Sequence, residues 1–177
     1  MKPQMLIDAP SVVLRRFRQE DTEKFFRMGQ EEEMRTWLPS HVFRDEAHAA
    51  SVLDYVIKQY DTGADPRTVP IVFAVQLKPT GDLVGHVGLI PSGEGVEVTF
   101  AIERAQQRKG FATEAVKAVC AWATGAYHIT RIHGITGKQN VASQRVLQRA
   151  GIAKLREQVM CFQGTKQAVV VFEYSSK

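Results

Sequence analysis

Residues 100–115 read FAIERAQQRKGFATEA, and this stretch decides the fold. Its apolar start continues a strand predicted over Val96–Ile102, and a short basic loop follows. From Phe111 to about Ala126, small and apolar residues recur on one stripe at helical spacing, so Gly110 stands where a helix begins. A helix N-terminus offers unpaired backbone N–H groups and the positive end of the helix dipole. A strand that leads through such a loop into a helix is therefore typical of a phosphate-binding site.

The composition of this loop fits that interpretation. Small residues at Gly110 and Ala112 let a phosphate approach the backbone, and Arg108 and Lys109 add positive charge. The pattern Gln/Arg-x-x-Gly-x-Gly/Ala that starts at Gln107 is weak on its own, and an ordinary glycine helix start with solvated basic neighbours is the alternative. The chain has neither G-x-x-x-x-G-K-[ST] nor G-x-G-x-x-G. A phosphate-bearing ligand other than a simple nucleotide is therefore indicated.

A second helix start follows 33 residues after Gln107, where residues 140–152 read NVASQRVLQRAGI. The pattern predicts a helix over Val141–Ala150 that Gly151 caps at its C-terminus. Asn140 stands at the N-cap position, and capping alone would account for it. Ser143 would then be an ordinary residue of the first turn.

The remaining segments predict an α+β fold in a single domain over residues 1–177. Apolar positions over Ala49–Tyr60 follow one face of a helix, and the turn-rich segment Asp61–Pro70 separates this helical part from a strand-rich part. Seven strands are predicted, over Val12–Phe17, Ile71–Leu77, Leu83–Ile90, Val96–Ile102, Arg131–Thr136, Ile152–Phe162 and Lys166–Tyr174. We expect a mixed, mostly antiparallel sheet of about seven strands with helices on both faces.

Composition excludes several classes of function. The chain has 177 residues, of which 44% are apolar and 24% charged, as in ordinary soluble domains. Its net charge of +4 is too small to indicate a nucleic-acid partner. We see no apolar run near the ~18 residues of a membrane span and no secretory signal. Cys120 and Cys161 show no disulfide or metal spacing, and the five histidines show no ligand spacing, so we expect reduced thiols, a cytoplasmic protein and no metal.

Taken together, the segments 96–115 and 140–152 resemble the GNAT superfamily of acyl-CoA-dependent N-acyltransferases. The resemblance covers nearly the whole chain and is strongest to the branch that contains ribosomal-protein N-terminal acetyltransferases. Val12–Phe17 is similar to the opening strand of that branch, and Asp82–Leu89 to its central hairpin strand. These motifs are specific for the superfamily, but they do not identify the acceptor, which is the amine that receives the acyl group.

The resemblance implies a role for each matching residue. The coenzyme A pyrophosphate would lie against the backbone of Gln107, Arg108, Lys109, Gly110, Phe111, Ala112 and Thr113. Phe100 and Ile102 would offer backbone hydrogen bonds to the pantetheine arm, as an added strand does. Asn140 would hydrogen-bond the coenzyme, and Ser143 would lie near the thioester sulfur as a proton donor to the leaving thiolate. Arg108 occupies a position where the family often has glycine, a change that main-chain contacts tolerate.

Glu97 matches a strand position where this family often carries a glutamate near the acceptor amine. Such a carboxylate can act as a general base, directly or through water. Strand alternation also allows Glu97 simply to face solvent, and both interpretations stay open. An acyl-cysteine route fits less well, because Cys120 lies mid-helix among apolar residues and Cys161 has no evident activating partner.

The sequence therefore predicts an acetyl-CoA-dependent N-acetyltransferase that acts by direct attack in a ternary complex, on a primary amine such as a protein or peptide N-terminus. The alternatives are an acetyltransferase for a small-molecule amine (amino acid, polyamine or antibiotic) and a non-catalytic acyl-CoA-binding module. We expect no nucleic-acid or membrane partner, and a monomer or a homodimer.

Three segments without a recognisable motif are expected to form the acceptor mouth, Gly29–Phe43, Asp61–Pro70 and Phe162–Lys166. Within the first segment, Trp37 lines this mouth or belongs to the core. The run 31–33 (EEE) is read as a solvated helix face rather than as a receptor for a basic acceptor.

Overall fold

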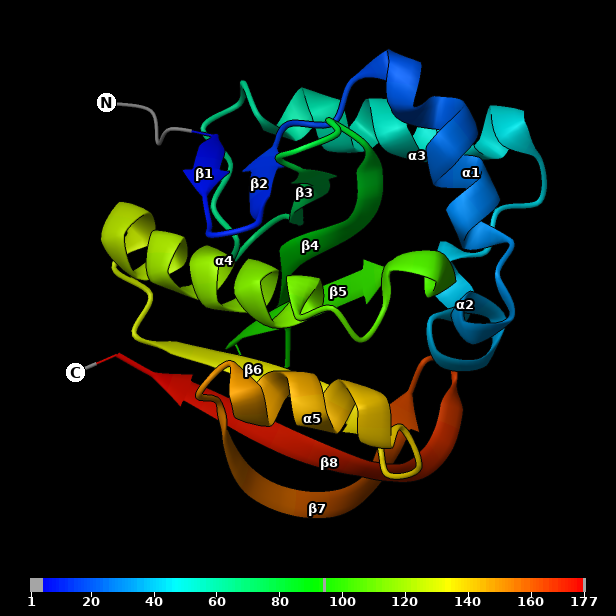
Figure 1. The fold of residues 1–177 in the computed structure, drawn as a ribbon. Helices are drawn as coiled ribbons and strands as arrows, with labels where there is room; N and C mark the ends of the chain where they lie inside the picture. Colours follow the sequence, from blue (N-terminus) through cyan, green and yellow to red (C-terminus); the bar gives the residue numbers. More distant parts are fainter. Residues whose placement is uncertain (1–4, 94, 177) are drawn as a thin grey trace.

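The computed structural model describes residues 5–93 and 95–176. The strands are β1 (Leu6–Asp8), β2 (Val12–Arg15), β3 (Ile71–Leu77), β4 (Leu83–Ser92), β5 (Gly95–Ile102), β6 (Arg131–Gly137), β7 (Ala153–Phe162) and β8 (Thr165–Ser175). The α-helices are α1 (Thr22–Gly29), α2 (Glu32–Trp37), α3 (Glu46–Gln59), α4 (Phe111–Tyr127) and α5 (Val141–Arg149). Short 3₁₀ helices are η1 (Gln19–Asp21), η2 (Pro39–His41) and η3 (Arg104–Gln106) (Figure 1).

The strands form one sheet in the order β1-β2-β3-β4-β5-β6-β8-β7. All neighbours in this sheet are antiparallel except β5 and β6, which are parallel. The mixed, mostly antiparallel sheet is thus confirmed. It has eight strands rather than about seven, because the short segment Leu6–Asp8 pairs with β2 as an edge strand. Three residues are too few to show the alternation by which a strand is predicted.

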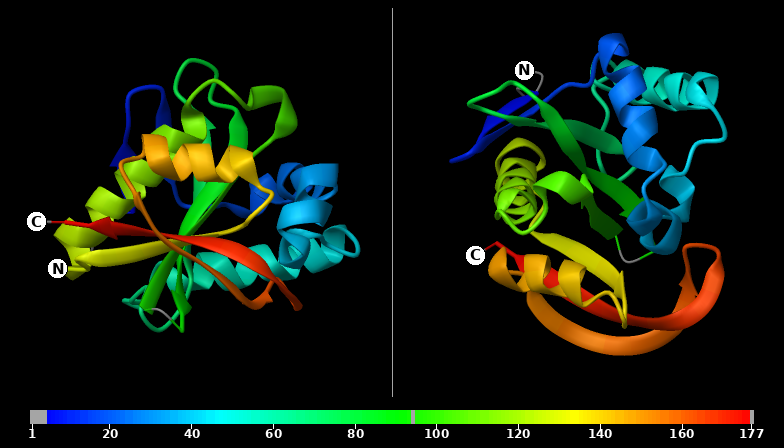
Figure 2. Two further views of the ribbon diagram at one scale, coloured as in Figure 1. Left: turned by 90° about the horizontal axis from the view of Figure 1, so that it is seen from below. Right: turned by 45° about the vertical axis from the view of Figure 1, so that its right-hand side comes forward.

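Helices cover both faces of the sheet, as predicted. Helix α4 packs on β1, β2, β4 and β5, whereas α1 and α3 pack on the opposite face, against β4 and β3 (Figure 2). Helix α5 packs on β6 and β7, on the same face as α4, and Leu147 of α5 lies directly over Gly134 of β6. A methyl group added to Gly134 would come within 2.8 Å of Leu147, so glycine allows this close approach.

Several element boundaries differ from the prediction. The strand predicted over Val12–Phe17 ends at Arg15, whose guanidinium turns to bind Asp21 of η1 at 2.7 Å. Helix α3 begins earlier than the apolar pattern, at Glu46, because the Asp45 side chain accepts a hydrogen bond from the backbone of His48 (2.7 Å). In the described part of the chain, no helix is long and apolar enough to cross a membrane.

The two parallel strands at the centre of the sheet stay together over a short length. Their register has a single pair of residues, Glu97 on β5 and His133 on β6. Beyond this pair the strands separate, and β6, β8 and β7 turn away from the part of the sheet formed by β1 to β5 (Figures 1 and 2). A small apolar cluster of Ile135, Val169 and Val171 lies on the far part, distinct from the main core. The sheet is therefore divided at the β5–β6 boundary.

Candidate functional site

Two strand-to-helix junctions meet at the β5–β6 boundary. Since β5 and β6 are parallel, their carboxyl ends lie at the same edge of the sheet, and the N-terminal ends of α4 and α5 lie on one side of the molecule (Figure 1). Helices α4 and α5 also contact each other. The two predicted segments, 107–113 and 140–143, are thus brought to the same edge.

The backbone of β5 faces this boundary at Phe100 and Ile102. The Glu103 N–H donates to the Val84 carbonyl at 2.8 Å. Because backbone groups alternate between the two sides of a strand, residues 97, 99 and 101 bond to β4 as Glu103 does, and Phe100 and Ile102 turn their backbone groups toward β6. The Ile102 carbonyl accepts a hydrogen bond from Gln107 Nε2 (2.9 Å). The Phe100 backbone and the Ile102 N–H thus face the side on which β6 has turned away.

The loop before α4 has an unusual backbone. Arg108 has φ 64° and Gly110 has φ 89°, both in the left-handed region. Lys109 between them donates from Nζ to Gln106 Oε1 (2.7 Å). Successive N–H groups in a tight turn of this kind converge into an anion-binding concavity. The strained Arg108 is the position where glycine was expected from the resemblance.

The N-terminus of α4 is open. Gly110 is the N-cap and supplies no side-chain hydrogen bond, while its carbonyl accepts from the Glu114 N–H at 3.0 Å. A methyl group added at Gly110 would meet no described atom within 4 Å. The backbone N–H groups of Phe111, Ala112 and Thr113, at the start of α4, therefore have no capping side chain as a partner. They lie beside space that an anion can enter.

Asn140 caps α5 as predicted, since its Oδ1 accepts from the Ser143 N–H at 3.2 Å. The described residues leave its Nδ2 amide group unpaired, so the cap does not exhaust the side chain. Ser143 lies on the first turn of α5. The sheet separates it from Glu97, because α5 runs back over β6 with Leu147 above Gly134, on the face opposite the Glu97 side chain.

Glu97 lines a pocket of about 400 Å³ on the face of the sheet opposite α4. The described lining residues come from β4, β5, β6, the β4–β5 turn and the β7–β8 hairpin, and they are Ile90, Ser92, Gly93, Glu97, Ile135, Met160, Cys161, Phe162 and Gln163. Burial raises the pKa of Glu97 to about 7. No described residue hydrogen-bonds to its carboxylate. A half-buried carboxylate with this pKa is suited to general base catalysis near neutral pH.

Residues of β6, β8, η2 and α2 lie next to this pocket. His133, the register partner of Glu97, is buried and contacts Glu173 Oε2 at 3.1 Å. At the mouth, the Ser40 hydroxyl of η2 donates to Gln163 Oε1 (3.2 Å), so η2 touches the β7–β8 turn. The Trp37 ring packs on the backbone of Gly137, at the carboxyl end of β6. Trp37 thus covers the strand end rather than the pocket itself.

The predicted mouth segments contribute unequally. Phe162 and Gln163 line the pocket, whereas no residue of Asp61–Pro70 does. Within the run 31–33, Glu32 alone is exposed. Glu31 accepts from the Arg104 N–H at 3.0 Å and Glu33 lies 3.6 Å from the Arg104 guanidinium, so these two residues join α2 to η3 instead of forming a purely solvated face.

The pocket walls are what sequence reasoning missed. Ile135 on β6 and Met160 on β7 were predicted only as strand residues, and nothing in their local pattern distinguishes a pocket wall from an ordinary core. The useful signal is alternation carried across the sheet, because registers that pair Ile135 with Val171 and Met160 with Gln167 place their side chains on the face of Glu97.

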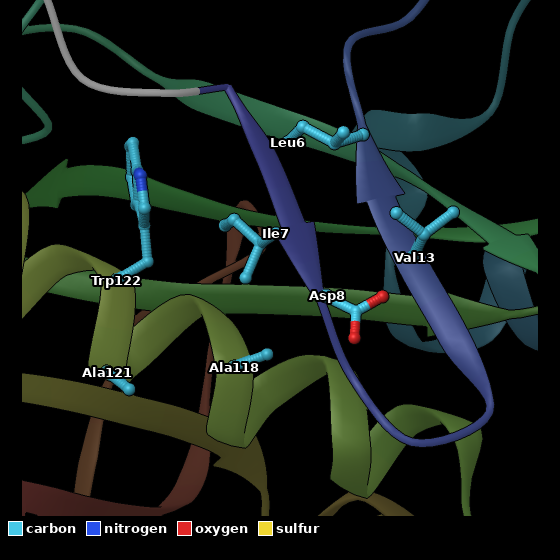
Figure 3. Close-up of a pocket in the computed structure, with 7 residues that line it drawn as sticks. All are labelled: Leu6, Ile7, Asp8, Val13, Ala118, Ala121 and Trp122. Carbon is cyan, nitrogen blue, oxygen red and sulfur yellow. The ribbon is translucent and has the colours of Figure 1, made fainter.

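A second pocket lies away from this edge. It is a groove between β1, β2 and α4, where Ile7, Ala118 and Trp122 face one another (Figure 3). Its single carboxylate, Asp8, pairs with Lys78 at 2.8 Å and is exposed. None of the predicted site residues lines this groove, so it offers no counterpart to the chemistry at Glu97.

The cysteines and histidines provide no further candidate for a nucleophile or a metal site among the described residues. Burial raises the pKa of the Cys120 thiol to about 12, so this cysteine is an inert core residue. Cys161 is exposed at the pocket rim. His86 is fully buried and stacks on His41 with 4.9 Å between ring centroids, which is a packing role. Within residues 5–93 and 95–176 no cluster of His, Cys, Asp or Glu has the arrangement of a metal site.

Solved structures share this fold over nearly their whole length. A GNAT-family acetyltransferase from Bacillus anthracis has a TM-score of 0.80 and 20% identity, over 97% of this chain and 98% of that one. The ribosomal L7/L12 α-N-protein acetyltransferase RimL, solved with coenzyme A, has a TM-score of 0.81 and 12% identity, over 96% and 97%. The ribosomal-protein-S5-alanine acetyltransferase from Vibrio fischeri has a TM-score of 0.78 and 16% identity, over 97% of each chain.

Comparison of the sequence identifies a protein family but no single related protein. No protein of curated function is similar to this chain at a significant level. The acetyltransferase (GNAT) domain family matches residues 11–153, a span that includes both strand-to-helix junctions and Glu97. The chain therefore belongs to the GNAT family of acetyltransferases.

Proposed function

We propose that this chain is an acetyl-CoA-dependent N-acetyltransferase, a single domain over residues 1–177, that acetylates the α-amine of a protein or peptide N-terminus. The observation that carries the proposal is the separation of β5 and β6 beyond Glu97 and His133. This separation leaves the β5 backbone and the N-termini of α4 and α5 facing one edge of the sheet, with the half-buried Glu97 carboxylate on the face opposite α4. RimL, which shares the fold, was solved with coenzyme A bound.

The coenzyme side of the proposal rests on the backbone. The pyrophosphate binds the main chain of Gln107, Arg108, Lys109, Gly110, Phe111, Ala112 and Thr113, where the α4 dipole and two basic side chains favour an anion. The pantetheine arm pairs with the Phe100 backbone and with the Ile102 N–H, since the Ile102 carbonyl is already bound by Gln107. Asn140 offers its Nδ2 group to the coenzyme while its Oδ1 keeps α5 capped.

The acceptor side rests on Glu97. The neutral amine attacks the thioester carbonyl, the C–S bond breaks, and the coenzyme thiolate leaves. The amine nitrogen loses one proton to Glu97, directly or through a water, and the thiolate gains one, for which the Ser143 hydroxyl is the proposed donor. Glu97 lies on β5 at the acceptor pocket, and Ser143 lies on α5 on the opposite face of the sheet, so the proposal assigns Glu97 to the acceptor and Ser143 to the coenzyme.

An α-amine suits a single carboxylate base. With a pKa near 8 it is about one quarter neutral at pH 7.5, whereas a lysine near 10.4 is about one thousandth neutral. The neutral fraction thus differs by about 200-fold, so an N-terminal amine needs less help from a general base such as Glu97 than a lysine does.

We place the enzyme in the cytoplasm, where free thiols such as Cys120 and Cys161 stay reduced. A monomeric or homodimeric state stays a prediction.

The test is a thiol-release assay with acetyl-CoA against a panel of peptides with free N-termini, amino acids and polyamines, combined with calorimetry of coenzyme A binding. The proposal expects turnover with peptides. Turnover with amino acids or polyamines alone would make the chain a small-molecule acetyltransferase. Tight coenzyme binding without turnover of any amine would make it a binding module.

A further inference from the structure

The register of β5 and β6 does not fix the distance between the two strand-to-helix junctions, because it has a single pair of residues, Glu97 and His133. The proposed coenzyme site nevertheless takes backbone groups from the loop before α4 and a side chain, Asn140, from the start of α5. Figure 1 shows α2 at this edge, next to the η3 turn that follows β5. We therefore consider what α2 contacts on each side of the opening.

The N-terminal end of α2 holds the first junction. Glu31 is the N-cap residue of α2, and its Oε2 accepts a hydrogen bond from the Arg104 N–H at 3.0 Å. Glu33 Oε1 lies 3.6 Å from Arg104 Nε. Nearby, Lys24 of α1 pairs with Glu103. Because Arg104 opens η3 and precedes the proposed pyrophosphate loop by three residues, these charge-assisted contacts fix the point from which the loop starts.

The C-terminal end of α2 holds the second junction. Trp37 is the last residue of α2, and Gly137 is the last residue of β6. A methyl carbon added to Gly137 would lie 3.3 Å from Cζ3 and 3.7 Å from Cε3 of the Trp37 ring. The Gly137 carbonyl accepts a hydrogen bond from the Asn140 N–H at 2.9 Å. The ring of Trp37 thus packs on the turn that carries Asn140.

These contacts are not explained by attraction of the coenzyme. Glu31 and Glu33 place negative charge beside a loop that, on the proposed function, binds an anion, and like charges repel. What the two carboxylates gain is their contact with Arg104. A ligand that bridges two binding elements binds more tightly when those elements are already held at the right distance, because less order has to be imposed on binding.

We propose that α2 is a brace that fixes the separation of the two coenzyme-binding junctions, with Glu31 and Trp37 as positioning residues. The inference rests on the proposed function and adds residues that act on the coenzyme through Arg104 and Gly137. Glu31 and Trp37 are six residues apart in sequence, about 9 Å along a helix at about 1.5 Å per residue. A segment expected at the acceptor mouth is thereby assigned a second role, in coenzyme binding.

The first test measures coenzyme A affinity by calorimetry without any acceptor, so that a role of α2 in acceptor binding cannot contribute. Glu31→Ala should weaken binding by roughly tenfold, as expected from losing one charge-assisted hydrogen bond. Glu32→Ala is the matched control, because Glu32 is the next residue and is exposed. Both variants remove one negative charge, which by electrostatics alone would leave the affinity equal or tighter. Glu32→Ala should show only that effect.

The conservative variant separates positioning from a loss of stability. Glu31→Gln keeps an oxygen that can accept from the Arg104 N–H and should retain most of the wild-type affinity. A modest loss of stability leaves nearly all molecules folded, so it does not by itself change the measured affinity. Equal affinities in Glu31→Ala and Glu32→Ala would overturn the brace and leave the proposed function standing. Absence of coenzyme A binding in the wild-type protein would refute both.

The second test asks whether the two ends act as one unit. Trp37→Ala should also weaken coenzyme A binding. The double variant Glu31→Ala/Trp37→Ala should bind about as weakly as the weaker single variant, because either change releases the brace. Losses that multiply in the double variant would show two independent contacts and would overturn the brace. If Trp37→Ala does not fold, the comparison of Glu31→Ala, Glu31→Gln and Glu32→Ala decides.

Discussion

Glu97 and His133 are paired across the parallel strands β5 and β6, and the strands separate immediately beyond them. The pair thus marks the level at which the sheet divides. On one side of this level the Phe100 backbone and the N-termini of α4 and α5 face the dividing edge, and at the level itself the Glu97 carboxylate enters an apolar pocket. A coenzyme and an acceptor that approach from opposite faces would meet there.

Glycine at position 110 should matter for the coenzyme more than for the fold. Gly110→Val places a side chain in the space before the α4 N-terminus and should weaken coenzyme A binding by roughly 10²-fold or more, as expected from losing charge-assisted hydrogen bonds of about 1.5–3 kcal/mol each. Calorimetry measures the affinity. Gly63→Val is a matched control, since Gly63 also has a positive φ (72°) and open space around it. It should lose similar stability and no affinity, and an unchanged affinity in Gly110→Val would refute the phosphate assignment.

Arg108 should show a trade-off between stability and coenzyme binding. Its φ of 64° is strained for a residue with a side chain, at about 1 kcal/mol, so Arg108→Gly should raise the free energy of unfolding by some tenths of a kcal/mol after the entropy of glycine is counted. Loss of the guanidinium should weaken coenzyme A binding. Lys109→Gly, at a position without a positive φ, should lower stability instead, and a stability loss in both variants would contradict the strain.

Asn140 should contribute to both stability and binding. Asn140→Ala removes the cap and should cost about 1 kcal/mol of unfolding free energy, while also raising the KM for acetyl-CoA. Asn140→Asp keeps an acceptor for the Ser143 N–H but removes the Nδ2 donor. Normal kinetics in Asn140→Asp, measured by thiol release, would show that the residue is a cap and nothing more.

Glu97 should destabilise the protein at neutral and higher pH. Its pKa is about 7 when folded and near 4.5 when unfolded, so between these values the folded protein binds the extra proton and stability falls as pH rises. Glu97→Gln should therefore be more stable than wild type at pH 8, by the order of 1–3 kcal/mol, and nearly equal to it at pH 4. Chemical denaturation at both pH values checks this, and equal stability at pH 8 would mean that the carboxylate is better solvated than the structure indicates.

Local patterns predicted the elements that carry the coenzyme site. The helical stripe after Gly110 and the cap at Asn140 are local features, and both appear where the sequence placed them. Strand β1 was not predicted, because it is only three residues long and is defined by its pairing with β2. The resemblance identified Arg108 as a position where the family often has glycine, but the positive φ of Arg108 was not predicted, since it is set by the loop as a whole.

The acceptor pocket could not be predicted in the same way. Glu97 was identified as a candidate, but its local alternation with Val96 and Val98 fits a solvated position equally well. Its burial comes from Ile135, Met160 and Phe162, which are far away in the chain and reach it only through the register of β6, β8 and β7. Long-range register is not contained in any local pattern.

The pH dependence of Glu97→Gln turnover tests the central claim most directly, with a peptide α-amine as acceptor. At pH 7 the variant should lose about 10²–10⁴-fold in kcat/KM, because the amide that replaces the carboxylate cannot take the proton. The deficit should shrink toward pH 9, where the amine arrives neutral, and coenzyme A affinity should not change. Wild-type turnover at pH 7 would contradict the role of Glu97 as the base, and a deficit equally large at every pH would show that it positions the substrate instead.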